Sequence, residues 1–145
     1  MINLKRTIFV ATLALSFPLA ASLTTTATAH AATWHSGTPK VLRGHWRGKK
    51  QTIKQYKYTG YASLNIKAKS LVNTPGLPPK DPNFSAKLHY KKTGKTTYTI
   101  TGREYNNAPQ KGFKITFKFK VYNHHKIAFK QVQGRTDGNG IFYKR

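Results

Sequence analysis

The sequence predicts an all-β protein, an antiparallel up-and-down meander of about eight short strands that closes into a small barrel. Two observations favour this class. From residue 41 onward apolar residues recur at every second position, and no segment keeps the 3.6-residue period of a helix for long. Turn-forming clusters of glycine, asparagine, aspartate and proline separate these segments. A barrel would pair every strand edge, and a two-sheet sandwich is the alternative.

The clearest strand is expected near the C-terminal third of the chain. Phe113, Ile115, Phe117, Phe119 and Val121 alternate there with polar residues, so one face should be buried and the other wet. Weaker alternation marks the remaining strands. In chain order, the predicted strands span 42–46, 55–58, 62–66, 86–90, 98–102, 113–122, 127–129 and 141–144.

One segment, 69–85, breaks the alternation. It carries Pro75, Pro78, Pro79 and Pro82, and proline cannot donate a hydrogen bond inside a sheet. We therefore expect a long loop here. Such loops often have a function, and this one could either cap a barrel mouth or simply plug one barrel end.

The N-terminal region has the layout of a secretory signal peptide. Lys5 and Arg6 precede an apolar stretch from Thr7 to Leu23, and small residues follow around Ala29. The apolar stretch is shorter than the roughly 20 residues of a membrane span. We expect cleavage after Ala31, a short tail at 32–40 and a single domain at 41–145, secreted and either extracellular or held non-covalently at a cell surface.

Charge and cysteine content narrow the function classes. The chain has 26 Lys and Arg against three acidic residues, a net charge of +23. Removing residues 1–31 leaves 24 basic residues against the same three acids, a net charge of +21. Such an excess attracts polyanions. Cysteine is absent, which excludes a disulfide framework and thiol catalysis.

The stretch from Leu42 to Trp46 contains a Gly-x-Trp step, Gly44-His45-Trp46. In this it resembles the first strand of lipocalins and other calycin barrels, avidins included. The resemblance implies that Gly44 permits a close backbone approach and that Trp46 seals the closed barrel end under a cation, Arg145 or Lys144. The stretch 33–50 also resembles the mature start of small secreted proteins of lactobacilli and related Gram-positive bacteria.

Placing that first strand at 42–46 directs Leu42 and Trp46 inward and Arg43, His45 and Arg47 outward. Large apolar residues dominate the whole predicted interior, which is therefore either filled or reduced to a narrow apolar slot. The lipocalin-like resemblance implies a small apolar ligand in such a slot. Its predicted lining residues are Leu64, Leu88, Tyr90, Tyr98, Ile100, Phe117, Phe119 and Phe129, with Phe113 and Ile115 also facing inward.

Lysines on the predicted outer face form the second candidate site. Residues two apart on a strand lie about 6.5 to 7 Å apart, so Lys118 and Lys120 would offer evenly spaced cations to a polymer. The full predicted set is Lys87, Lys91, Lys114, Lys118, Lys120, Lys126 and Lys130. The alternative function is therefore electrostatic attachment to an anionic cell-surface polymer around a filled core, and the alternative role of the lysines is solubility alone.

Other functions are not expected. Asp81, Glu104 and Asp137 are too dispersed for a catalytic carboxylate pair, so we expect no enzyme. His124 and His125 are adjacent and would point to opposite faces of a strand, so we expect no metal site and no cofactor. The run 111–117 departs from the RNA-binding sheet motif after three residues, so we expect no specific nucleic-acid partner. The chain should act as a monomer.

Overall fold

The computed structural model describes residues 33–76, 81–106, 109–134 and 138–145, and the predicted signal peptide lies outside them. Within these ranges the chain forms nine strands and two short 3-10 helices. The elements are β1 (His35–Ser36), η1 (Lys40–Leu42), β2 (Gly44–Ile53), η2 (Lys54–Tyr56), β3 (Tyr58–Ile66), β4 (Ser70–Thr74), β5 (Asn83–Lys92), β6 (Thr97–Glu104), β7 (Phe113–Asn123), β8 (Lys126–Gln131) and β9 (Gly140–Lys144).

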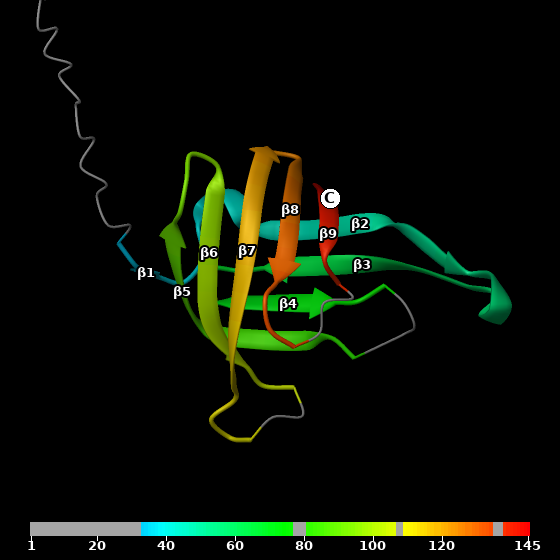
Figure 1. Cartoon of the computed structure of the whole chain (residues 1–145), viewed down its shortest axis with the longest axis horizontal. Coiled ribbons are helices and arrows are strands. Elements are labelled where there is room, and N and C mark those ends of the chain that lie inside the picture. Colours follow the sequence, from blue (N-terminus) through cyan, green and yellow to red (C-terminus); the bar gives the residue numbers. More distant parts are fainter. Residues whose placement is uncertain (1–32, 77–80, 107–108, 135–137) are drawn as a thin grey trace, which may run out of the picture. The chain divides into compact units, whose positions relative to one another are not determined.

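Strands β2 to β9 form a closed antiparallel barrel (Figure 1). Each strand pairs with the next along the chain, and β9 returns to β2 through Trp46↔Lys144 and Gly48↔Phe142. The short β1 adds to β5 outside this ring of eight strands. The predicted all-β, up-and-down barrel is confirmed. Because hydrogen bonding is continuous around the ring, the alternative of two stacked sheets is wrong.

Alternation along the strands builds the core, as the sequence predicts. Trp46, Leu64 and Phe142 come from three adjacent strands and are each at most 1% exposed. Phe129 lies at the centre of an aromatic cluster, with its ring centroid 5.6 Å from that of Phe117, 5.2 Å from that of Phe119 and 5.9 Å from that of Phe142. The barrel interior is packed with side chains at this level.

The segment 55–58 is not a strand, which corrects one prediction. Strand β2 continues to Ile53, and η2 with left-handed Lys57 (φ 49°) turns the chain into β3. Residues 50–53 pair only with 58–61, so this part of the hairpin lies beyond the barrel wall (Figure 1). We call residues 49–61 the hairpin arm. The hairpin arm contains too few apolar residues to form a buried face, and the apolar alternation in its sequence is correspondingly weak.

The segment 69–85 is not a long loop, which corrects a second prediction. Strand β4 occupies 70–74 and pairs with both β3 and β5, and Leu71 is fully buried. Strand β4 ends just before Pro75, and β5 begins just after Pro82. The prolines thus delimit two strands. Residues 77–80 lie outside the described part, so the idea of a capping loop is limited to 75–82 and remains untested there.

Residues 33–40 do not form a free tail, which corrects a third prediction. The backbone N–H of Gly37 donates to Leu88 O at 2.6 Å, and that of Thr38 donates to Ala68 O at 3.0 Å. The Thr38 hydroxyl, fully buried, donates to Lys67 O at 2.7 Å. This segment is therefore part of the fold at the barrel end that contains Trp46. The apolar pattern of the sequence could not predict this attachment, because the segment is polar and is held by backbone hydrogen bonds rather than by buried apolar side chains.

Three strands contain register shifts: between Arg47 and Lys50 in β2, between Ala86 and His89 in β5, and between Val121 and Asn123 in β7. Irregularities of this kind bend and twist a strand, which helps a sheet to close into a barrel. At the shift in β5, Lys87 has a positive φ of 52°. Simple alternation therefore fails at Lys87.

Candidate functional site

The residues predicted to line an apolar slot are packed against one another. Leu64, Leu88, Ile100, Phe117, Phe119 and Phe129 are each at most 2% exposed. Tyr90 and Tyr98 are half-buried at the edge of the same core, with ring centroids 6.5 Å apart. Phe113, also predicted to face inward, is 54% exposed because it begins β7 at the end of the barrel. The apolar-ligand hypothesis stays a prediction, and the packing favours the reading of a filled interior.

The Gly-x-Trp step closes one barrel end. Trp46 is 1% exposed, and its indole N–H donates to Leu42 O at 2.7 Å. Leu42 is buried as expected but belongs to η1 rather than to the first strand. Of the two cations that the resemblance offered, Arg145 and Lys144, it is Lys144 that lies over the indole, with Nζ 5.4 Å from the ring centroid. Arg145 instead donates its backbone N–H to His45 O at 2.9 Å.

Gly44 has the role that its position suggests. Its φ is +129°, a conformation that residues with a Cβ rarely adopt. A Cβ there would lie 3.1 Å from Lys144 Cε. The glycine therefore lets the Lys144 side chain pass close to the backbone on its way to the Trp46 ring.

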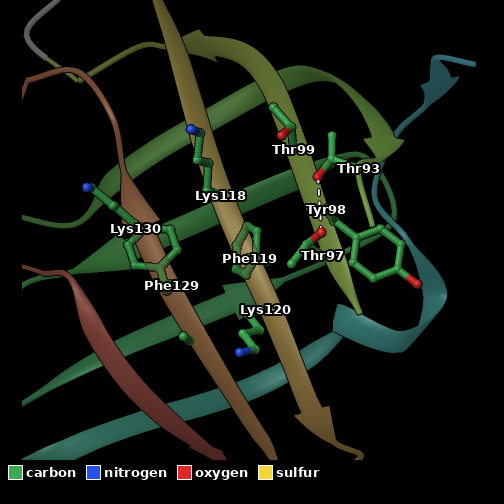
Figure 2. Close-up of a pocket in the computed structure, with 10 residues that line it drawn as sticks. Thr93, Thr97, Tyr98, Thr99, Lys118, Phe119, Lys120, Phe129 and Lys130 are labelled. Carbon is green, nitrogen blue, oxygen red and sulfur yellow. Dashed lines mark hydrogen bonds between the residues drawn. The ribbon is translucent and has the colours of Figure 1, made fainter. Parts of the chain in front are cut away.

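Three of the predicted surface lysines meet around one depression of about 450 Å³ on the outer face of β6, β7 and β8 (Figure 2). Lys118 and Lys120 come from β7 and Lys130 from β8, and all three are exposed. In Figure 2 the side chains of Lys118 and Lys130 extend in the same direction from neighbouring strands. The lining residues are Thr93, Thr97, Tyr98, Thr99, Lys118, Phe119, Lys120, Ala128, Phe129 and Lys130, none of them acidic.

The strand register places two of these cations directly opposite each other. Lys118 of β7 pairs with Lys130 of β8, while Thr99 of β6 pairs with Lys118 on its other side. Like charges at directly opposite positions destabilise a sheet. An anion bound between Lys118 and Lys130 would relieve this repulsion, whereas a surface needed only for solubility would gain nothing from placing them together.

Threonine hydroxyls are the part of this surface that was not predicted from the sequence. Thr97 and Thr99 alternate on β6, and the Thr93 and Thr97 hydroxyl oxygens lie 3.3 Å apart in a hydrogen bond. A hydroxyl can donate to an anion while a lysine neutralises its charge. The signal was present as the T-x-T-x-T pattern at 97–101, opposite the lysines of the next strand. We call the three lysines with Thr93, Thr97 and Thr99 the lysine–threonine face.

The other predicted lysines lie elsewhere. Lys91 holds its Nζ 4.9 Å from the Trp34 ring centroid, one strand beyond Thr99. Lys126 lies 5.1 Å from the Tyr122 ring and 6.0 Å from the Tyr143 ring. Lys114 borders a separate depression at the opposite end of β7, and Lys87 borders another near Gly37. The predicted set is thus divided among several places, and only three members share the depression.

The structure also places the other polar residues that the sequence raised. His124 and His125 form the turn between β7 and β8 with ring centroids 4.0 Å apart, so they do not point to opposite faces of a strand. Asp81 is exposed, Glu104 ends β6, and Asp137 lies outside the described residues. Across the described ranges no three His, Cys, Asp or Glu side chains come together as metal ligands would.

Comparison with known proteins adds no relative: no family model, curated protein or solved structure matches the chain. In the described residues no helix is long and apolar enough to span a membrane.

Proposed function

We propose that this chain is a secreted, non-catalytic binding protein that holds an anionic polymer of a cell surface on its lysine–threonine face. The observation that carries the proposal is the depression beside the cross-strand pair Lys118↔Lys130, which contains cations and hydroxyls and no acidic residue. We further propose that the barrel is calycin-like, on the resemblance of its Gly44-His45-Trp46 step and its strand count. The packed core supports attachment through the outer surface in preference to an apolar ligand inside.

A polymer suits this face better than a single small anion. Lys118 and Lys120 are two residues apart on one strand, a separation of about 6.5 to 7 Å. Lys130 faces Lys118 from the next strand, about 5 Å away at the backbone. A chain with regularly repeated phosphate or carboxylate groups can contact these cations in succession. Each contact is exposed and weak by itself, so several must act together.

Binding should depend strongly on salt. Contacts with about three anionic groups predict that affinity for linear polyphosphate falls about 20-fold between 50 and 200 mM NaCl, taking the slope known for single-stranded polyanions. Titrations by fluorescence anisotropy at several salt concentrations measure this slope. An affinity that stays constant over that range would contradict the proposal, because it would exclude ionic contacts as the basis of binding.

A further inference from the structure

The inner surface of the barrel changes from apolar to polar at the end opposite Trp46. Asn73, Asn83, Ser85 and Gln131 are each at most 4% exposed. They come from β4, β5 and β8, near the ends of those strands that lie away from Trp46. We call these four residues the polar mouth. Burying four polar side chains together is costly unless their hydrogen bonds are satisfied.

Some of these hydrogen bonds are made within the protein. The Asn73 amide donates from Nδ2 to Gln131 Oε1 at 3.4 Å, and Gln131 donates from Nε2 to Gln133 O at 2.9 Å. Three buried atoms have no hydrogen-bond partner among the described residues: Asn73 Oδ1, Asn83 Nδ2 and Ser85 Oγ. They comprise an acceptor, a donor and a hydroxyl that can do both. Such groups in native proteins usually have a partner.

A depression of about 480 Å³ opens at this end of the barrel, and two residues of the polar mouth, Asn83 and Gln131, contribute to its lining. Its volume lies within the roughly 300 to 1,000 Å³ of ligand pockets. Phe113, 54% exposed, also lines it and offers an open aromatic surface. The neighbouring Asn106 side chain is already engaged, since Nδ2 donates to Pro82 O and Oδ1 accepts from the Phe84 N–H at 3.3 Å. Of the three residues with an unpaired buried atom, only Asn83 contributes to the lining of this depression.

The chemistry of the lining indicates the class of ligand. One carboxylate, Glu104, and one ammonium, Lys114, border the depression, so it has no excess of positive charge, unlike the lysine–threonine face. An apolar ligand would leave the Asn83 amide unpaired. A neutral polyhydroxy compound offers adjacent donors and acceptors for the amides and a C–H face for the Phe113 ring.

We propose that the polar mouth binds a neutral saccharide of one or two rings, with the Asn83 amide as a hydrogen-bond donor and Phe113 as the packing surface. This site is separate from the lysine–threonine face, and its existence does not depend on polymer binding there. The alternation of apolar residues predicted Phe113 to lie in the core, but its exposed ring lines this depression instead.

The test is an NMR titration of the full domain with glucose, galactose, N-acetylglucosamine, maltose and chitobiose. At about 10 mM sugar, tenfold above a 1 mM dissociation constant, we expect saturable shifts of the Asn83 and Gln131 side-chain amides with at least one of them. Linear polyphosphate should leave these two signals unchanged. If none of the five sugars shifts them, or if the uncharged apolar probe N-phenyl-1-naphthylamine does so instead, the proposal is wrong.

Two variants separate binding from folding. Asn83→Leu removes the unpaired donor, so it should keep or raise the melting temperature while weakening sugar binding at least about tenfold. Phe113→Ala alters an exposed ring and should fold normally, with a similar loss of binding. A clear fall in the melting temperature of Asn83→Leu would show that the amide is satisfied within the protein, and unchanged sugar affinity in both variants would exclude the site; either result overturns the proposal.

Discussion

Replacing Lys118, Lys120 and Lys130 together by glutamine should weaken binding to linear polyphosphate about tenfold at low salt. The three side chains are exposed around one depression that contains no acidic residue. Removing them deletes the cations while the threonine hydroxyls remain. The salt dependence should become shallower by about two units in the logarithmic slope, since about three counterion-releasing contacts are lost. Fluorescence anisotropy with labelled polyphosphate measures both effects.

The hairpin arm provides a matched control. Changing Lys49, Lys50 and Lys54 to glutamine removes the same charge from exposed positions outside the depression. This control should retain most of the affinity, because net charge changes equally while the local arrangement is kept. Equal losses in the two triple variants would mean that total charge, and not the lysine–threonine face, determines binding. The far-ultraviolet spectra of all three proteins should coincide.

Replacing Phe129 by alanine should lower the free energy of unfolding by about 3 to 5 kcal/mol. Its ring is 2% exposed and lies within 6 Å of three other phenylalanine rings. Each surrounding strand is hydrogen-bonded to a neighbour on both sides around the barrel. The cavity left by the missing Phe129 ring can therefore collapse only in part. Since a domain of this size is stable by about 5 to 15 kcal/mol, the loss should be visible as a large shift of the urea midpoint.

Phe113→Ala is the matched control for this effect, because the same change is made at a side chain that is 54% exposed. We expect a change within about 0.5 kcal/mol. A destabilisation of Phe129→Ala no larger than that of Phe113→Ala would contradict a close-packed interior and would reopen the hypothesis of a hollow barrel with an apolar ligand.

The fold class could be read from the sequence because alternation is strong wherever a strand has one buried face. From Phe113 to Val121 every second residue is apolar, although only Ile115, Phe117 and Phe119 are fully buried. Phe113 shows the limit of this method. Alternation determines which side of the sheet a residue is on, but not whether the barrel extends far enough to cover it.

The two errors in strand placement have a common cause: the alternation of apolar residues did not coincide with the position of the strand. The segment 55–58 has apolar residues at alternate positions but belongs to a turn outside the barrel wall, whereas 70–74 is a short strand of mixed polarity that directly precedes the proline-rich stretch 75–82. The predicted number of barrel strands was therefore right although one strand was misplaced. Strand β4 buries Asn73 beside Leu71, and a buried asparagine gives no apolar signal.

The lysine–threonine face was predicted only in part. Alternation placed Lys118 and Lys120 on one outer face, but the register that brings Lys130 opposite Lys118 depends on the turn at His124 and His125. The spacing of residues in the sequence does not reveal the register shift at Lys87. Nor does it reveal that Lys91 and Lys126 lie against aromatic rings. The polar mouth was not predicted, because its residues are distant in sequence and meet only when the barrel closes.

Amide chemical-shift mapping with linear polyphosphate at about 150 mM NaCl, where longer-range attraction is screened beyond about 8 Å, tests polymer binding most directly. We expect the largest shifts at residues 97–99, 118–120 and 128–130, on the three adjacent strands that form the depression. The arm at 49–61 should shift less. Shifts spread evenly over all lysine-bearing surfaces, or largest on the arm, would contradict a defined polyanion site on the barrel wall.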